Sequence, residues 1–188
     1  MGDRCHPVPG SPPDADLAEE VVWQGKYVTA KRRGRWEYVD RARNIRAAVI
    51  LATIDGDVLL VEQYRVPLGR SCLELPAGLI GDDAEGEDDL VAAGRELKEE
   101  TGYRAGRLED LGTFYSSPGM LGESFTLVRA SELERTGTGG GTKGENITVH
   151  RVPLAEIAAF VAAKRAEGCG VDVRVLMLLA GGILAGEI

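Results

Sequence analysis

The stretch GRELKEETGY, residues 94–103, places Glu96, Glu99 and Glu100 within five positions of one another. In a helix these positions are i,i+3 and i,i+4 neighbours, so the three carboxylates lie on one side and repel one another. Such a cluster is usually a solvated face, because glutamate is a good helix former. The rest of the chain decides whether this cluster instead binds a group that offsets the repulsion.

The residues around the cluster predict a helix over 87–101. Leu90, Ala93 and Leu97 form an apolar stripe, the acidic start suits the positive end of a helix dipole, and Gly102 is typical of a helix stop. The glutamates then lie on a face adjacent to the stripe, which we expect to be exposed to a cleft beside the core. Carboxylates at a cleft suit Mg²⁺ or Mn²⁺, which take oxygen ligands and commonly bridge to substrate phosphates.

Length, charge and cysteine content restrict the class of protein. A chain of 188 residues fits one ordinary domain with a small appendage, and its formal net charge of -8 argues against a nucleic-acid partner. A small phosphorylated substrate stays compatible, because a bound divalent cation can invert the local charge. Cys5, Cys72 and Cys169 are odd in number and far apart, which predicts neither a disulfide framework nor a zinc site and favours the reducing cytoplasm. His6 and His150 lie outside any cluster, so a histidine-based metal site is not expected.

Neither end of the chain predicts a membrane segment. Residues 1–20 have no apolar core like that of a signal peptide, and we expect them to form a disordered lead-in. The most apolar stretch, 175–186, is too short to span a bilayer and is expected to be a buried helix.

Strands and a few helices alternate along the rest of the chain, which indicates a layered α/β or α+β domain. Residues 47–54 and 57–64 are nearly continuously apolar and flank Asp55-Gly56, which predicts a tight hairpin of strands covered on both faces. Residues 136–144, TGTGGGTKG, are expected to form a flexible loop. The other expected strands are 21–29, 35–41, 72–78, 107–115, 123–129 and 146–152, and the other expected helices are 154–167 and 171–185.

Nine positions match the Nudix box, Gly-x5-Glu-x7-Arg-Glu-U-x-Glu-Glu-x-Gly-U, where U is a bulky aliphatic or aromatic residue. A match of this length arises by chance in well under about one chain in a hundred thousand, so the sequence resembles the Nudix family. The matching residues are Gly81, Glu87, Arg95, Glu96, Leu97, Glu99, Glu100, Gly102 and Tyr103.

One departure from the family pattern lies before the helix. In many relatives with the sequence ELPAG the box glycine follows the alanine, which is Gly78 here, and a glutamate comes six residues later. Position 84 is alanine in this chain, and Glu87 comes nine residues after Gly78. We interpret GDDAEGE, residues 81–87, as a loop lengthened by three residues, and either Gly78 or Gly81 fills the box position.

The Nudix resemblance implies a fold, a reaction and a metal. The fold is an α/β/α sandwich with a mixed β-sheet, expected over 45–188, preceded by a small antiparallel β subdomain over 21–44. The reaction is hydrolysis of a nucleoside diphosphate linked to another moiety, with Mg²⁺ or Mn²⁺ as cofactor. The resemblance makes Glu96 and Glu100 the principal metal ligands, with Glu99 nearby and the Ala77 carbonyl as a further ligand. Arg95 would orient a glutamate, with Glu87 as its ion-pair partner.

Flanking segments resemble the ADP-ribose pyrophosphatase branch: VEQYRVPLG, ELPAGLIG, EETGY, and YSSPG with Pro118. This branch hydrolyses ADP-ribose to AMP and ribose 5-phosphate, and exchanges N-terminal strands across a homodimer. The resemblance implies that adenine is clamped by aromatic residues, with Glu37 near the base and two arginines near the diphosphate. The clamps would be Tyr27 and Trp36, and the arginines Arg41 and Arg65. Simple packing of an amphipathic strand is the alternative role for the aromatic pair.

Two questions stay open at this level. The substrate could instead be GDP-mannose or ADP-glucose, or the domain could bind a nucleotide sugar without cleaving it, although every box glutamate is present. The branch carries its general base on a mobile loop after the late strands, which implies Glu145, and the preceding glycines suit a loop that moves. Glu123 is the competing candidate for that role.

Overall fold

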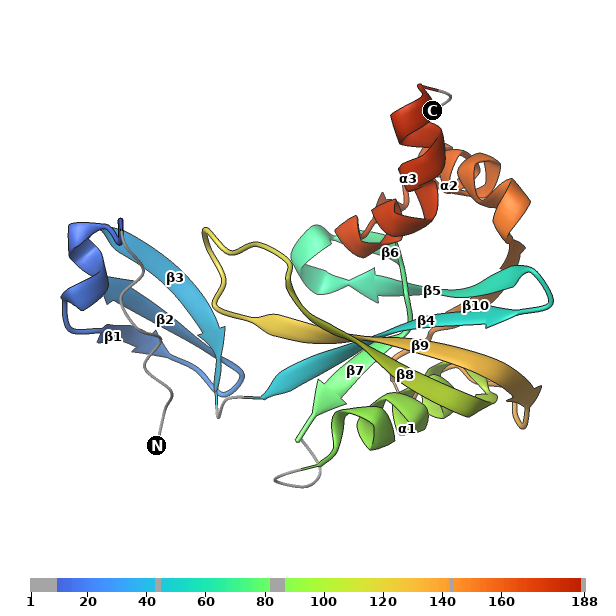
Figure 1. The fold of residues 1–188 in the computed structure, drawn as a ribbon, viewed down its shortest axis with the longest axis horizontal. Helices are drawn as coiled ribbons and strands as arrows, with labels where there is room; N and C mark the ends of the chain where they lie inside the picture. Colours follow the sequence, from blue (N-terminus) through green and yellow to red (C-terminus); the bar gives the residue numbers. More distant parts are fainter. Residues whose placement is uncertain (1–9, 43–44, 82–86, 143, 187–188) are drawn as a thin grey trace. The chain divides into compact units, whose positions relative to one another are not determined.

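The computed structural model describes residues 10–42, 45–81, 87–142 and 144–186. The chain divides into two compact units. The N-terminal unit comprises residues 1–44 and 117–123, and the large unit comprises 45–116 and 124–188. Each unit has its own sheet, so each is described by itself (Figure 1).

The N-terminal unit is built on an antiparallel sheet of β1 (Glu20–Gln24), β2 (Val28–Arg33) and β3 (Trp36–Arg41), in that order. The prediction of one strand over 21–29 is therefore wrong. A turn in which the Gly25 N–H donates to the Val28 carbonyl (2.9 Å) separates β1 from β2. Segment 117–123 returns to this unit and bonds to β3, where the Val39 N–H donates to the Met120 carbonyl (3.0 Å).

Part of the expected disordered lead-in is ordered. Pro13–Asp16 form a short 3-10 helix in which Asp14 is buried. Arg35 donates to the Asp14 carboxylate (Nε–Oδ2 3.0 Å), which ties this helix to the turn between β2 and β3. Residues 1–9, which include Cys5 and His6, lie outside the described residues.

The large unit begins with the predicted hairpin, β4 (Arg46–Ile54) and β5 (Asp57–Arg65). The two strands pair antiparallel, with Ile54 opposite Asp57. Asp55 has φ 52° and Gly56 has φ 84°, the left-handed conformation that a two-residue type I′ turn needs. The hairpin prediction is confirmed.

Further strands extend this hairpin into a mixed eight-stranded sheet. The order is β11-β6-β5-β4-β9-β8, with β10 paired to β5 and β7 paired to β4. The β4–β9 and β11–β6 pairs are parallel. The added strands are β6 (Arg70–Glu74), β7 (Ala77–Ile80), β8 (Tyr103–Tyr115), β9 (Ser124–Arg135), β10 (Thr148–Pro153) and β11 (Gly170–Val171).

The expected strand over 72–78 is broken into β6 and β7 at Leu75-Pro76. Proline has no N–H to donate to a ladder, so the chain bends there. The bend is fixed because the Ile50 N–H of β4 donates to the Pro76 carbonyl (2.8 Å) and Leu75 is fully buried.

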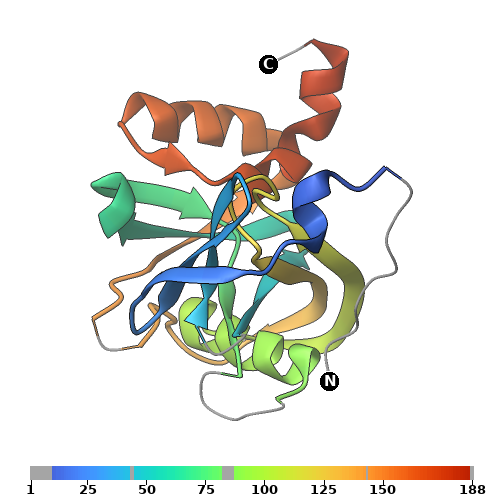
Figure 2. The same cartoon turned by 90° about the vertical axis from the view of Figure 1, so that its left-hand side faces the viewer.

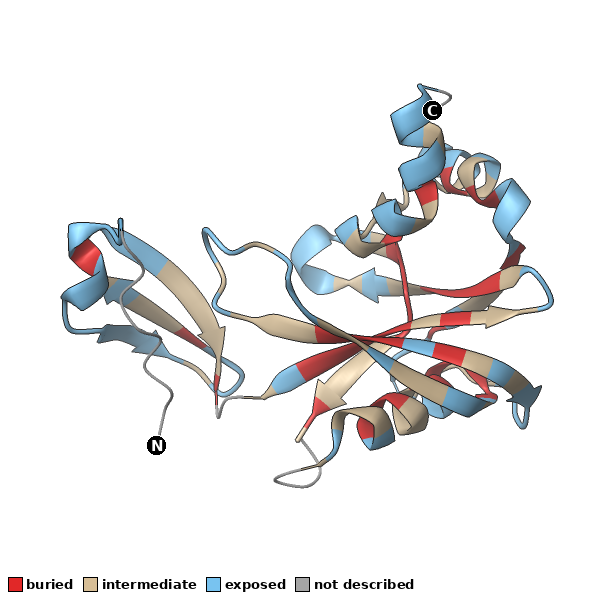
Figure 3. Ribbon diagram, viewed as in Figure 1, coloured by how far each residue is buried: buried red, intermediate tan, exposed pale blue. Residues whose placement is uncertain are grey.

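Helices cover both faces of the sheet in the large unit. Helix α1 (Asp89–Thr101) lies on one face, and α2 (Ile157–Ala166) and α3 (Leu176–Ala185) lie on the other (Figures 1 and 2). Successive β4 residues alternate between the two cores: Ile50 packs in the α1 cluster and Val49 in the α2–α3 cluster. This confirms strands covered on both faces and the α/β/α sandwich with a mixed sheet (Figure 3).

The C-terminal helix differs from the prediction. Strand β11 and a 3-10 turn, Val173–Val175, occupy the start of the range expected to be helical. Leu179 of α3 is buried, but Leu184 is 88% exposed, so the expectation of a buried helix is only partly met. Within the described residues, no helix is long and apolar enough to cross a membrane.

Candidate active site

Helix α1 is fixed at both ends by its sequence. The Asp88 side chain accepts hydrogen bonds from the N–H groups of Leu90 (3.0 Å) and Val91 (3.3 Å), so the helix begins two residues later than predicted. Gly102 ends it in the left-handed conformation (φ 77°). Asp89 pairs with Arg46 of β4 (2.7 Å), which holds the first turn against the sheet.

Glu100 is buried, with 7% of its surface exposed, so the expectation that it lies on an exposed face is wrong. Its Oε2 accepts a 3.0 Å hydrogen bond from the Ala77 N–H of β7. Burial raises the pKa of Glu100 to about 8, against the lowering effect of the Ala77 hydrogen bond, and the charges of Glu96 and Glu145 raise it further. Glu100 is therefore the buried end of the glutamate cluster, because strand β7 covers that side of the helix.

Arg95 links three of the predicted site glutamates. Its Nη1 lies 2.8 Å from Glu96 Oε1 and 3.4 Å from Glu99 Oε2, and its Nε lies 3.4 Å from Glu87 Oε1. Burial lowers the pKa of Arg95, but the hydrogen bond to Glu87 and the charge of Glu96 outweigh this effect and raise it. For Glu96, burial raises the pKa and outweighs the lowering effect of Arg95. The structure thus brings Glu87, at the end of the undescribed segment 82–86, to Arg95.

Gly78 and Gly81 have different structural requirements. A Cβ added at Gly78 would overlap the Cγ, Cδ and Oε1 atoms of Glu96, so a larger residue there would force this side chain to move. Gly81 has φ 84°, a conformation that side chains rarely adopt. Gly78, one of the two candidate box glycines, contacts the glutamate cluster at Glu96.

The carboxylate groups of Glu96, Glu99 and Glu100 are suitable ligands for a hard cation, although they do not point toward a common position. Among the described residues, no group of three or more His, Cys, Asp and Glu side chains is placed to hold a metal ion. Glu96 and Glu99 face Arg95, whereas Glu100 faces Ala77. Partly or fully buried carboxylates with raised pKa values gain from a nearby positive charge, and oxygen is the ligand that Mg²⁺ and Mn²⁺ prefer. The residues therefore fit a divalent cation.

The glycine-rich loop is attached to α1 by its backbone. The N–H groups of Gly140 and Gly141 donate to the carbonyls of Glu100 (2.8 Å) and Glu99 (3.0 Å), and Thr136 and Gly137 both donate to Gly102 (2.8 and 3.0 Å). Residues 136–142 are in neither helix nor strand, as the composition predicts for 136–144, and residue 143 lies outside the described residues. Residues 136–141 cap the C-terminal end of the helix, satisfying carbonyls that a helix end leaves unpaired. We call this arrangement the loop clasp.

Glu145 follows the loop clasp directly and is exposed. Its Oε2 accepts hydrogen bonds from the Thr142 N–H (2.5 Å) and hydroxyl (2.9 Å). Its charge raises the pKa of Glu96 and of Glu100, which places it within electrostatic range of the cluster. Glu123 belongs to the N-terminal unit, where Arg41 donates to its carboxylate.

Arg65 lies at the end of β5 and is bound by a residue that the sequence analysis missed. Its Nε and Nη2 donate to the two carboxylate oxygens of Glu74 at 2.6 and 2.8 Å. Glu74 is 3% exposed, and Arg174 is a second cation beside it (3.6 Å). The signal in the sequence was a carboxylate within the apolar run CLELPAG, since a buried charge needs a partner.

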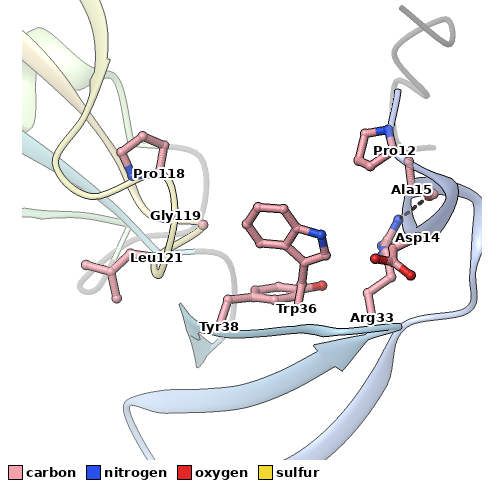
Figure 4. A pocket seen from close by; sticks show the side chains of 10 residues that line it. Pro12, Asp14, Ala15, Arg33, Trp36, Tyr38, Pro118, Gly119 and Leu121 are labelled. Carbon is pink, nitrogen blue, oxygen red and sulfur yellow. Dashed lines mark hydrogen bonds between the residues drawn. The ribbon is translucent and has the colours of Figure 1, made fainter. Parts of the chain in front are cut away.

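The N-terminal unit contains a cavity of about 280 Å³. Trp36 and Pro118, both predicted to bind substrate, line it together with Tyr38 and Leu121. Figure 4 shows the Trp36 indole between Pro118 and Pro12, with Tyr38 beside it. The structure therefore brings these two predicted residues together at one mainly apolar cavity.

The remaining predicted substrate residues lie elsewhere in the N-terminal unit. Tyr27 is 62% exposed, is not among the described residues that line the cavity, and has the Lys26 ammonium 4.9 Å from its ring centre. Glu37 is exposed on β3, next to Trp36. Arg41, at the end of β3, is paired with Glu123.

The family model described as NUDIX domain matches residues 42–168, well over half of the chain. This match covers α1, the glutamate cluster and every strand of the large sheet except β11. The chain belongs to the Nudix family.

Two relatives and one solved structure illustrate the range of similar proteins. The chain is 38% identical to the methanol dehydrogenase activator of Bacillus methanolicus (63% of this chain and 63% of the relative), and 42% identical to the ADP-ribose pyrophosphatase of Bacillus subtilis strain 168 (62% and 65%). The chain thus spans less than two thirds of the length of these relatives. A crystal structure of an ADP compounds hydrolase has the same fold, with a TM-score of 0.66, 24% identity, and coverage of 92% of this chain and 95% of that one.

Proposed function

We propose that this protein hydrolyses the diphosphate bond of ADP-ribose to AMP and ribose 5-phosphate with Mg²⁺ or Mn²⁺ as cofactor. The observation that carries the proposal is the pair of buried Glu100 and partly buried Glu96 on α1. Glu100 is held against Ala77, and Glu96 against Gly78 and Arg95, which Glu87 contacts in turn. The similarity to a B. subtilis ADP-ribose pyrophosphatase supports the choice of substrate.

Glu96 and Glu100 would hold the cation, with Glu99 beside them and the Ala77 carbonyl as a further ligand. When bound, the cation would neutralise the charge of the diphosphate and acidify a water molecule. Arg95 sets the orientation of Glu96 through the 2.8 Å contact, and Glu87 holds Arg95 from its other side. The raised pKa of Glu100 fits this role. Burial disfavours its ionised form, and a bound cation would stabilise that form.

Glu145 would act as the general base that takes a proton from the attacking water. Its carboxylate is exposed and bonded only within its own turn among the described residues, to Thr142, so reorientation breaks two local hydrogen bonds. The loop clasp ends at Gly141, so Glu145 would reorient together with Thr142 while the clasp keeps its bonds to α1. Loop movement that completes a site on substrate binding is a common catalytic device.

The proposed substrate-binding residues are side chains of the N-terminal unit and, in the large unit, Arg65. The Trp36 and Pro118 cavity has the apolar, aromatic lining that suits a purine base. Tyr27 and Glu37 would contact the base as well. Arg41 and Arg65 would contact the diphosphate, since a guanidinium binds phosphate oxygens in pairs.

The assembly is proposed to be a homodimer with exchanged N-terminal strands, located in the cytoplasm. Strand β1 exposes Val21 (54%), Val22 (60%) and Trp23 (57%), an apolar edge that supports contact with another chain. The acidic net charge of -8 supports a small-molecule substrate over a nucleic acid.

The test is release of AMP from ADP-ribose by the purified protein, with and without Mg²⁺, beside GDP-mannose and ADP-glucose. We expect ADP-ribose to give the highest kcat/KM and chelation to abolish turnover. Glu100→Gln should remove most of the turnover, because the charge is needed for the cation. Preference for another nucleotide sugar would change the proposed substrate, and binding without cleavage of any nucleotide sugar would indicate a regulatory domain.

A further inference from the structure

A buried carboxylate lies between two arginines at the end of β6. Glu74 is 3% exposed, and Arg65 forms a bidentate salt bridge with it through hydrogen bonds of 2.6 and 2.8 Å. Arg174 Nη2 lies 3.6 Å from Glu74 Oε2. Isolated buried charges are costly, and the two guanidinium groups offset the cost of burying this carboxylate in the core.

The second arginine is itself held in place. Arg174 donates from Nε and Nη2 to Asp172 at 2.6 and 2.8 Å, and its guanidinium carbon lies 5.8 Å from the ring centre of Phe125. The Asp172 N–H donates to the Leu73 carbonyl (3.0 Å), which fixes this part of the chain to β6. The four side chains Arg65, Glu74, Arg174 and Asp172 therefore form a continuous network with two charges of each sign.

The network adjoins the glutamate cluster. Glu74 and Ala77 lie at the two ends of the Leu75-Pro76 bend, and Ala77 bonds to Glu100. The charges of Arg65 and Glu100 interact: Arg65 lowers the pKa of Glu100, whereas the hydrogen bond to Glu74 and the charge of Glu100 raise the pKa of Arg65. The Arg65 and Glu100 charges therefore lie within electrostatic range of each other across the bend.

Arg65 keeps one side available to a ligand. Its side chain is 42% exposed, and its bonds to Glu74 use Nε and Nη2, so that among the described residues no hydrogen bond involves Nη1. A guanidinium anchored along one edge has lost most of its rotational freedom before a ligand arrives, which lowers the entropic cost of binding.

We infer that Glu74 is a positioning residue that holds the Arg65 guanidinium toward the diphosphate of the substrate, with Arg174 supplying the second positive charge that keeps Glu74 buried. The inference rests on the proposed function for the identity of the substrate. Glu74 does not touch the substrate in this scheme and acts through Arg65.

The test is a double-mutant cycle of Glu74→Gln and Arg65→Gln, with kcat and KM for ADP-ribose measured for each variant. Glutamine keeps the size of Glu74 but loses the charge that anchors the guanidinium. Glu74→Gln alone should raise KM about tenfold and change kcat less than about threefold, because ground state and transition state lose the same contact. In the Arg65→Gln background, Glu74→Gln should change KM less than about twofold, since the group that it positions is gone.

Two further variants exclude a general loss of structure. Glu74→Asp keeps the charge and should restore part of the affinity lost in Glu74→Gln. Glu62→Gln is the matched control, because Glu62 is also a largely buried carboxylate, on the same strand as Arg65, but pairs with His150 and Lys164 (both 3.0 Å), and its KM should stay at the wild-type value. If Glu74→Gln does not fold, the same cycle is run with Glu74→Asp.

The inference would be overturned if Glu74→Gln changed KM by the same factor whether residue 65 is Arg or Gln. If the wild-type protein cleaves no nucleotide sugar, the proposed function fails, and the cycle is then measured as the Kd of Mg·ADP by calorimetry. A non-additive loss of ADP affinity there supports the positioning role, whereas additive effects, or no binding of ADP by the wild type, overturn it.

Discussion

Gly78 of β7 and Glu96 of α1 touch so closely that a Cβ at position 78 would overlap the Cγ, Cδ and Oε1 atoms of the glutamate. The backbone of a strand thereby forms one wall around a proposed metal ligand. This wall is rigid, because β7 pairs with β4 on its other side, with Gly78 opposite Ala48.

Gly78→Ala should displace Glu96 and reduce both stability and metal-dependent turnover. The clash is of the size that costs about 1 to 3 kcal/mol in a packed interior. Thermal unfolding and Mg²⁺ titration of activity measure the two effects. Gly181→Ala is the control, because position 181 lies within α3 with open space around it, and alanine there should stabilise the protein by about 1 kcal/mol. Wild-type stability and activity in Gly78→Ala would contradict the close packing.

The raised pKa of Glu100 predicts a pH-dependent stability of the metal-free protein. The folded protein keeps the Glu100 proton up to about pH 8, whereas the unfolded chain releases it near the ordinary value of 4.5. The folded state therefore binds more protons between these values, so the free energy of unfolding falls as pH rises from about 4.5 to about 8 and then levels off. The raised pKa of Glu96 acts in the same direction.

Glu100→Gln should remove most of this fall, because glutamine does not titrate. The measurement is the melting temperature of wild type and variant in the presence of a chelator, from pH 5 to pH 9. The difference between the two melting temperatures at each pH gives the contribution of Glu100. Parallel curves for wild type and variant would show that Glu100 is ionised in the folded protein throughout this range.

Trp36→Ala should weaken nucleotide binding more than it slows the reaction. A ring stacked on a base far from the cleaved bond contributes equally in the ground and transition states, so KM should rise while kcat stays close to wild type. Trp23→Ala is the matched control, since Trp23 is a similarly exposed tryptophan of the same unit (57% against 48%) and is absent from the described lining of the cavity. A collapse of kcat with unchanged KM would instead indicate a structural role for Trp36.

Glu145→Gln should lower kcat by roughly 10² to 10⁴, about 3 to 5 kcal/mol of barrier, with little change in KM. The physical reason is loss of the group that accepts the proton from water. Glu123→Gln, measured beside it, should keep kcat within a few fold of wild type, because that carboxylate is paired with Arg41. A larger loss of kcat at position 123 than at 145 would move the role of general base to Glu123.

The sequence predicted those parts of the molecule that depend on local chemistry. The Asp55-Gly56 turn needs two residues that accept positive φ, and the stripe of α1 needs apolar residues at helical spacing; both signals are contained in a few neighbouring positions. The Nudix spacing likewise identified Glu87, Arg95 and Glu96, which the structure brings into contact.

Features that depend on distant segments were not predictable in this way. Burial of Glu100 results from β7, more than twenty positions earlier in the chain, and the partners of Glu74 come from β5 and from the turn before α3. The split of 21–29 into two strands follows from a backbone hydrogen bond at Gly25, which leaves little trace in composition.

The loop clasp affects how fast the backbone amides near the glutamate cluster exchange with solvent. Its amides are bonded to the carbonyls of α1, so hydrogen exchange at Gly140 and Gly141 requires the loop clasp to detach from the end of the helix. Gly140 and Gly141 would then exchange slowly although their composition is that of a flexible linker, whereas the amides of Thr142 and Glu145, which among the described residues are bonded only to each other's residue, would exchange faster. The boundary between the two regimes would fall at Gly141, a hinge one residue before the turn that carries Glu145.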